Sequence, residues 1–354
     1  MIYEDNLRDY RDVDSLSLLE FDNSSKGEIS IFGVPTGFGA GRSAGNVTGR
    51  APCYLRERGL QKMLRHIGFD IFDKGNFKIE EKDFDSSKVF NGVRNIVEVV
   101  KVSEDLGKEV FSEINLGRKI LAIGGDHSMS IGSILGASSA LKGNIGLIWI
   151  DAHADLNGSV DLENPENIDA SPTGNAHGMP VRVLTGLHSH VCFRGLVDKF
   201  QGIDPKNVLF IGLKDLDLGE ISLLRSEGFN FVTIDDINIT GGVQKVIDKI
   251  IKLRSRVGSV WVDLDIDALD ETIAPATPMP NKSGITGHHI RTIFKFLGKY
   301  FNTSDTRVIG MGVAELMPSL DADGKTADLV LELVASAFGG RYTEFDRYLD
   351  NPEG

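Results

Sequence analysis

The chain has 354 residues, of which 41% are hydrophobic and 25% are charged, as is usual for globular proteins. Its 38 basic and 51 acidic residues give a net charge of −13, which disfavours nucleic acid and anionic membranes as partners because both require a basic face. The acidic N-terminus and the absence of a run of about 18 apolar residues predict neither a secretory signal nor a membrane span. Cys53 and Cys192 lie far apart, which indicates free thiols in a reducing compartment, with one disulfide as the alternative. We therefore expect a cytoplasmic protein.

Short apolar runs recur along the chain, each followed by a turn signal and a helical pattern. They are rich in Ile, Val and Leu, as expected for strands that are covered on both faces. The runs are residues 28–35, 119–126, 145–153, 207–215, 229–237, 259–267 and 307–316. The clearest amphipathic stretches between and after them are residues 92–114, 243–256, 286–300 and 326–339. Strands that alternate with helices predict a parallel sheet with helices on both faces.

No repeat, low-complexity tract or linker divides the sequence into parts. We therefore expect one domain over residues 1–354, in which residues 1–27 form an N-terminal extension. The loop 158–174 is long and polar and lies close in sequence to the acidic groups described next, so we expect it to lie at the active site.

Four of the predicted strands end in side chains that commonly bind metal ions. In open parallel sheets ligands gather beyond the carboxyl ends of the strands, so these groups are expected to converge. In an extended segment residues i, i+2 and i+4 face one side, which would align Asp151 with His153 and Asp155, and Asp265 with Asp267. The four groups are GGDHS at 124–128, DAHADLN at 151–157, DLDID at 263–267 and Glu315.

Histidine and carboxylate ligands without thiolates suit Mn, Zn or Fe(II), and a set rich in carboxylates favours Mn or Mg. The number of ligands exceeds what one ion needs, and shared carboxylates would bridge two ions about 3.5–4 Å apart. Each motif alone has a simpler interpretation, such as a tight turn whose Asp126 caps a helix. A calcium loop at 263–274 is disfavoured because Ala268 and Ala274 stand where such a loop needs Gly and Glu. So many acidic groups at buried strand ends would be costly without cations, and the combination favours a metal centre.

These motifs resemble the ureohydrolase family, and within it the arginases. The resemblance runs from GVPTGFGAGRSAG at 33–45 through TGNAHGMPV at 173–181 and IGLKDLDLGE at 211–220 to AELMPSLD at 314–321. It implies a three-layer α/β/α fold with a central parallel sheet. It also implies two manganese ions, with Asp151 and Asp265 as the bridging ligands. The full ligand set would be His127, Asp151, His153, Asp155, Asp265 and Asp267.

The resemblance further implies that metal-bound hydroxide attacks the guanidinium carbon of L-arginine, which yields L-ornithine and urea. Asp155 would also hydrogen-bond the hydroxide, and Glu315 would hold the guanidinium through charge-assisted bonds. His177 would act as the proton shuttle. Arginases commonly form trimers or hexamers, so a homo-oligomer is expected.

Specificity for arginine requires contacts to its α-carboxylate and its α-ammonium. By resemblance, Asn157 and Thr173 would contact the carboxylate. Asp217 would meet the ammonium, and Glu220 would assist through water. Two alternatives stay open: hydrolysis of another guanidino compound, such as agmatine or a guanidino acid, and a catalytically silent arginase-like binding protein.

The sequence departs from the usual pattern of the family at a few positions near these motifs. Asp263 stands where serine is usual, which adds an acid two residues before Asp265. Glu271 replaces a common proline, and Pro278–Met279 replaces Gly-Thr. The loop 158–174 is longer than in typical arginases. These departures bear on metal affinity and on the choice of guanidine.

Overall fold

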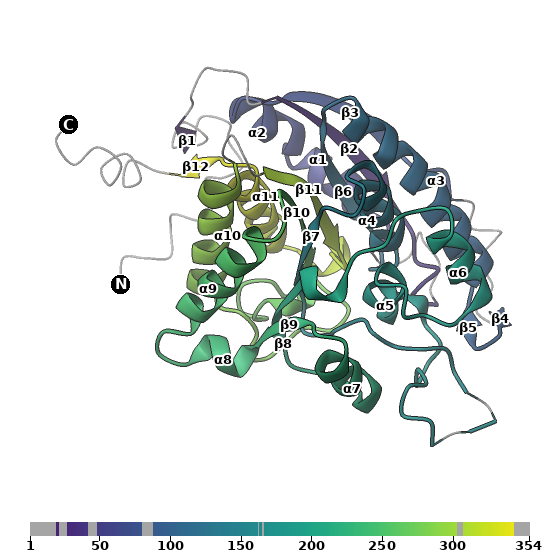
Figure 1. Ribbon diagram of the computed structural model, residues 1–354. Coiled ribbons are helices and arrows are strands. Elements are labelled where there is room, and N and C mark those ends of the chain that lie inside the picture. The colour runs from purple at the N-terminus through teal and green to yellow at the C-terminus, as the bar shows by residue number, and fades with distance from the viewer. Residues whose placement is uncertain are drawn as a thin grey trace.

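Eight parallel strands form the central sheet, in the order β3-β2-β6-β11-β10-β7-β8-β9 (Figure 1). The structure is a computed structural model that describes residues 19–20, 27–41, 48–79, 88–161, 163–164, 166–302 and 307–342. The strands are β2 (Glu28–Val34), β3 (Asp70–Asn76), β6 (Lys119–Gly124), β7 (Gly146–Ile150), β8 (Val208–Leu213), β9 (Asn230–Thr233), β10 (Ser259–Asp265) and β11 (Arg307–Ala314). Two small antiparallel pairs join β1 (Leu19–Glu20) to β12 (Arg341–Tyr342), and β4 (Val89–Phe90) to β5 (Val93–Arg94).

Every predicted apolar run contains a strand of this sheet, but β3 was not predicted. β3 lies at the edge of the sheet, and its residues alternate between exposed and partly buried positions. Only Ile71 and Phe72 give it apolar character, and Phe72 is 36% exposed. A strand without a continuous apolar run carries no signal for burial on both faces.

Helices cover both faces of the sheet and make it the middle of three layers, as the resemblance implied (Figure 1). Successive residues of a strand point to opposite faces, so Ile148 and Ile150 pack into one core while Leu147 and Trp149 pack into the other. One face carries α1 (Ala51–Glu57), α2 (Leu60–His66), α8 (Ile234–Asn238), α9 (Gly242–Arg254), α10 (Gly287–Phe301) and α11 (Lys325–Ala337). The other carries α3 (Ile96–Asn115), α4 (Met129–Ala140), α5 (Pro180–Leu184), α6 (Val191–Val197) and α7 (Leu218–Ser226). Short 3-10 helices lie at Ala176–Gly178, Pro205–Asn207, Ile266–Ala268 and Pro318–Leu320.

Helix α4 directly follows the GGDHS motif and is almost entirely buried. It has no polar face, so its sequence lacks the amphipathic period by which α3, α9, α10 and α11 were predicted. Two glycines let α4 cross α3 closely. A Cβ on Gly132 would lie 2.4 Å from the backbone oxygen of Ser103, and a Cβ on Gly136 would lie 2.4 Å from the backbone oxygen of Gly107. The turn that carries His127 is therefore attached to a tightly packed helix.

The order of the strands brings the predicted site together. β6, β11, β10 and β7 are neighbours at the centre of the sheet, and the histidine and acidic groups follow their carboxyl ends. The chain reaches these four strands in the order β6, β7, β10, β11, so the strand order changes direction here. Ligands bind at such switch points because the loops diverge and leave a crevice.

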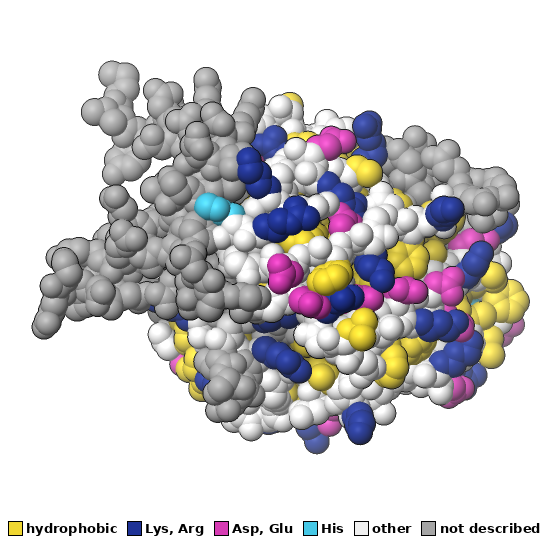
Figure 2. Space-filling view, turned by 90° about the horizontal axis from the view of Figure 1, so that it is seen from above, with side chains coloured by type: hydrophobic (Ala, Val, Ile, Leu, Met, Phe, Trp, Pro, Cys, Tyr) yellow, Lys and Arg dark blue, Asp and Glu magenta, His cyan; other side chains and the backbone are white. Residues whose placement is uncertain are grey.

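The outer surface carries charges of both signs. On the face seen in Figure 2, Lys and Arg side chains lie among Asp, Glu and apolar side chains, so the negative net charge is not concentrated there.

Both Cys53 and Cys192 are free. In the part of the chain described, no helix is long and apolar enough to cross a membrane. Most of the predicted N-terminal extension, 1–27, lies outside the described residues, as do residues 162 and 165 of the loop 158–174.

Candidate metal centre and substrate pocket

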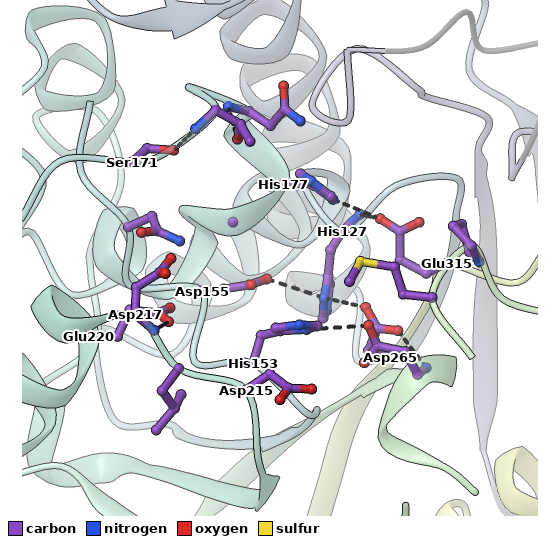
Figure 3. Close-up of a pocket in the computed structure, with 18 of the residues that line it drawn as sticks. His127, His153, Asp155, Ser171, His177, Asp215, Asp217, Glu220, Asp265 and Glu315 are labelled. Atoms are coloured by element: carbon purple, nitrogen blue, oxygen red, sulfur yellow. Dashed lines mark hydrogen bonds and ion pairs between the residues drawn. The ribbon is translucent and has the colours of Figure 1, made fainter. Parts of the chain in front are cut away.

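A pocket of about 470 Å³ opens at the carboxyl ends of the central strands (Figure 3). Every predicted site residue except Asp151 lines this pocket, and Asp151 is fully buried nearby. Among the described residues that form the lining there are seven carboxylates and three histidines, but no lysine or arginine. The carboxylates are Asp155, Asp215, Asp217, Glu220, Asp265, Asp267 and Glu315. Such a lining favours a cationic ligand.

Two groups of side chains bring their ligand atoms within 4.8 Å of one another, close enough to hold a metal ion. One group is His127, Asp151 and Asp265, and the other is Asp151, His153 and Asp267. Asp151 belongs to both, so its two oxygens can serve two adjacent ions. Asp155 lies beside the first group, with its Oδ2 3.3 Å from Nδ1 of His127.

The turns after β7 and β10 aim these carboxylates. β7 ends at Ile150, so residues 151–155 do not form the extended segment assumed from the spacing. Instead, the His153 backbone nitrogen donates to Oδ1 of Asp151 at 2.8 Å, and the Asp267 nitrogen donates to Oδ1 of Asp265 at 2.8 Å. The same i to i+2 turn thus holds one carboxylate at the end of each strand.

His127 lies at the centre of the first group. Its Nδ1 is 3.2 Å from Oδ2 of Asp151 and 3.0 Å from Oδ2 of Asp265, and its ring stacks on Trp149 with centroids 4.1 Å apart. Burial alone would lower the pKa of His127, but hydrogen bonds with Asp151, Asp263 and Asp265 outweigh it and raise the pKa well above its usual value. The ring is therefore fixed with Nδ1 toward the carboxylates.

The crowding of acids fits a bound cation. Burial, and then the charges of neighbouring carboxylates, raise the pKa of Asp155 and of Asp265 well above the usual range, and raise that of Asp267 to about 6. Oδ2 of Asp155 and Oδ1 of Asp267 are buried and accept no hydrogen bond. Buried carboxylate oxygens without donors are stabilised by metal coordination, so the residues present suit a pair of divalent ions.

Glu315 and His177 face each other above the metal-ligand groups (Figure 3). Nδ1 of His177 lies 3.2 Å from Oε1 of Glu315, which also accepts a bond of 3.1 Å from the His127 backbone nitrogen. Burial alone would lower the pKa of His177, but the bond to Glu315 outweighs it, and the pKa is raised. Glu315 has a φ of 59° and Asp155 a φ of 50°, a left-handed backbone that is rare outside glycine and is often found at functional sites.

The far end of the pocket is built by the loop after β7 and the start of α7. Glu220 is buried, and its two oxygens accept bonds from the Leu156 nitrogen at 3.0 Å and the Asp217 nitrogen at 2.9 Å. Asp217 is exposed at the mouth, and Asn157 is partly buried. Thr173 is exposed, and its Oγ1 accepts a bond of 3.2 Å from the Asn175 nitrogen.

Some lining residues were not predicted. Asp215, Ser171, Thr277 and Met279 contribute to the wall of the pocket. Asp215 stands two residues before Asp217 in the same acidic motif, and that spacing was a usable signal. Ser171 and Thr277 carry no comparable signal, because isolated hydroxyl residues are common in loops.

Comparisons with known proteins agree with this geometry. A model of the arginase family matches residues 27–339. An arginase of Staphylococcus aureus (strain MRSA252) is 36% identical over 327 residues, covering 89% of this chain and 98% of that protein. The solved arginase of Bacillus caldovelox superposes with a TM-score of 0.78 at 30% identity, covering 89% of this chain and 99% of that one. A formimidoylglutamase of Bacillus subtilis shares the fold, with a TM-score of 0.64 at 19% identity and 95% coverage of both chains.

Proposed function

The chain belongs to the arginase family, and on this premise we propose that it is a binuclear manganese hydrolase that converts L-arginine to L-ornithine and urea. The observation that carries the proposal is the pair of metal-ligand groups that share Asp151 at the floor of an acidic pocket. The reaction is the hydrolysis of a C–N bond in a linear amidine. The Staphylococcus aureus and Bacillus caldovelox relatives, both named arginases, match this chain over nearly their whole length.

His127, Asp151, Asp155 and Asp265 would hold one manganese ion, and Asp151, His153, Asp265 and Asp267 would hold the other. A ligand set that is dominated by carboxylates and contains no thiolate favours Mn or Mg, and the likeness to arginases favours manganese of the two. When bound, the two ions supply a water that is acidic enough to act as a nucleophile at neutral pH. Besides its ligand role, Asp155 would accept a hydrogen bond from that water.

Glu315 and His177 would act on the guanidinium group. The Glu315 carboxylate lies beside the metal-ligand groups and can accept charge-assisted bonds from guanidinium nitrogens. His177 contacts Glu315 and is 33% exposed in its side chain, so it reaches both the reacting group and solvent. It would give a proton to the leaving nitrogen and recover one from the solvent.

The far end of the pocket would select arginine among guanidines. Asp217 offers a carboxylate for the α-ammonium, and Asn157 and Thr173 offer amide and hydroxyl donors for the α-carboxylate. Glu220 fixes the backbone on both sides of this end through its bonds to Leu156 and Asp217. Agmatine lacks the carboxylate and would leave those donors without a partner.

Substrate preference tests the proposal directly. The protein is loaded with Mn²⁺, freed of excess metal, and assayed for urea release from L-arginine, agmatine and 4-guanidinobutyrate. Arginine is expected to be the best substrate, and Asp155→Asn is expected to abolish activity while the circular dichroism spectrum stays unchanged. A better rate with agmatine or the guanidino acid would overturn the assignment of arginine. An inactive protein that binds two Mn²⁺ ions would favour a binding role.

We also propose that the protein works in the cytoplasm as a homo-oligomer, a trimer or a hexamer. The support is the likeness to arginases, together with an acidic net charge of −13 that disfavours binding to nucleic acid or anionic membranes. Light scattering coupled to size-exclusion chromatography gives the number of subunits from the mass. A mass near 38.6 kDa would overturn the oligomer.

A further inference from the structure

Asp263 lies next to the metal-ligand groups, but it is not a member of either. It precedes Asp265 by two residues on β10, so both side chains leave the same face of the strand. The ring of His127 lies between them, with Nε2 2.9 Å from Oδ1 of Asp263 and Nδ1 3.0 Å from Oδ2 of Asp265. One edge of the imidazole thus faces the candidate metal site and the other faces Asp263.

The indole N–H that contacts Asp263 requires an acceptor, and the Ser130 hydroxyl and the His127 ring can both donate to one. Oδ1 also accepts a bond of 3.0 Å from the hydroxyl of Ser130, and Oδ2 accepts one of 2.8 Å from the indole Nε1 of Trp261. The Trp261 N–H can only donate. An ionised carboxylate accepts at both oxygens, whereas an amide presents a donor at one of them.

The neighbouring strand makes room for this carboxylate. Gly312 of β11 pairs with Asp263, and a Cβ on Gly312 would lie 2.2 Å from Oδ2 of Asp263. A Cβ on Gly310 would likewise lie 2.2 Å from Cζ3 of Trp261. Asp263 is 0% exposed, so the carboxylate lies in a closed space, where its polar contacts among the described residues are the side chains of His127, Ser130 and Trp261.

We propose that Asp263 is a positioning residue of the metal centre: it accepts a hydrogen bond from Nε2–H of His127 and thereby directs the Nδ1 lone pair of His127 toward the metal. The inference rests on the proposed manganese site and deepens it. A histidine ligand whose second nitrogen donates to a carboxylate has a fixed tautomer and a more basic metal-binding nitrogen. Asp263 therefore contributes to metal affinity without touching the metal.

Asp263→Asn is the informative substitution because it keeps the shape and changes one acceptor into a donor. If the amide nitrogen faces His127, the ring must accept at Nε2 and carry its proton on Nδ1, where the metal would bind. If it faces Trp261 instead, two N–H groups oppose each other in a closed space. We expect Mn²⁺ affinity to weaken by about 10–100-fold, as is common when a residue that hydrogen-bonds a metal ligand is replaced.

The measurement is a Mn²⁺ titration of the full chain. The electron paramagnetic resonance signal of free Mn²⁺ reports how much of the metal stays unbound. Trp261→Phe is the first control, because it alters the same cluster but keeps the bond between Asp263 and His127. Asp321→Asn is the second control. It changes another buried carboxylate, which accepts from the Thr326 and Ala327 nitrogens and does not line the pocket. Both controls should bind Mn²⁺ within about threefold of the wild type.

Affinity in Asp263→Asn within about threefold of the wild type would overturn the inference, as would an equal weakening in Trp261→Phe. If Asp263→Asn does not fold, histidine-selective ¹⁵N NMR of the Zn²⁺-loaded wild type, assigned with His127→Asn, decides instead. A proton on Nε2 of His127 is expected, and a proton on Nδ1 would overturn the inference. A wild-type protein that binds no Mn²⁺ would overturn both the proposed function and this inference. Tight Mn²⁺ binding by the wild type and equally tight binding by Asp263→Asn would overturn this inference alone.

Discussion

Glu220 holds the backbone of Asp217 in place, since Oε2 of Glu220 accepts a hydrogen bond of 2.9 Å from the Asp217 nitrogen. Its other oxygen accepts a bond of 3.0 Å from the nitrogen of Leu156, which stands between Asp155 and Asn157. One buried carboxylate therefore joins the start of α7 to the loop after β7. This side chain links the two walls at the far end of the pocket, beside the backbone bonds from Lys214 and Asp215 to the Ala152 oxygen.

Glu220→Gln should lower both stability and substrate affinity. The glutamine can accept only one of the two backbone bonds at its oxygen, and its NH₂ would face the other N–H. We expect the free energy of unfolding to fall by about 1–3 kcal/mol, because a buried backbone donor loses its acceptor. KM for arginine should rise more than kcat falls. Urea denaturation and steady-state kinetics measure the two effects.

Asp217→Asn is the matched variant for that experiment. Asp217 is exposed at the mouth of the pocket and is the N-cap residue of α7, a position that Asn fills as well as Asp, so Asp217→Asn should raise KM without changing the free energy of unfolding. If Glu220→Gln were as stable as the wild type, the bracing role of Glu220 would be wrong.

Removal of metal should lower the unfolding temperature. The cluster contains several carboxylates whose pKa values are raised by burial and by one another, and a divalent cation relieves that repulsion. A ligand present at 100 times its Kd stabilises the folded state by about 2.7 kcal/mol. Scanning calorimetry with Mn²⁺ and with a chelator should therefore give clearly different midpoints, and identical midpoints would argue against the site.

His177→Asn should separate proton transfer from metal binding. The asparagine cannot carry a proton at neutral pH, so kcat should fall by about 10²–10⁴-fold. The Mn²⁺ content should stay unchanged, because His177 lies in neither metal-ligand group. Metal analysis of the purified variant beside its kinetics gives both quantities. A variant that has lost its metal would place His177 in the metal site instead.

Glu113 should make stability depend on pH in the acidic range. Burial alone would raise the pKa of Glu113, but hydrogen bonds from Ser30, Arg118 and Lys74 outweigh it and lower the pKa to about 2. The folded pKa lies below the unfolded value of about 4.3, so the contribution is present above pH 4.3 and is lost as the pH falls toward 2. Glu113→Gln should cost about 1–3 kcal/mol at pH 7, and the difference from wild type should shrink below pH 4.

Urea denaturation between pH 7 and pH 3 tests this dependence. Glu109→Gln is the control, because Glu109 lies on the same helix and 3.9 Å from the same Lys74, but its side chain is 52% exposed. Exposed ion pairs contribute little, so this variant should match the wild type at every pH. A difference between Glu113→Gln and wild type that is constant with pH would contradict the prediction.

Most strands of the sheet could be predicted because a strand buried on both faces needs an unbroken apolar run. Sequence patterns did not predict β3, whose edge position allows alternating exposure, or α4, whose nearly complete burial removes the amphipathic period. In both elements the environment differs from the one that the pattern assumes. A sequence pattern therefore predicts a strand or a helix only when the element is buried in the way that is typical of its class.

The chemistry of the site is readable in the sequence, because ligand types such as His127, Asp151 and Asp265 stand in recognisable motifs at strand ends. The atoms that each of these side chains contacts cannot be predicted from the sequence. Asp263 and Asp265 have the same residue type on the same face of β10, yet one contacts Nε2 of His127 and the other Nδ1. That difference arises because His127 follows β6, which is separated from β10 by β11 in the sheet. Strand order follows from packing between distant segments, so the distinct positions of two equivalent acids emerge only when the whole chain has folded.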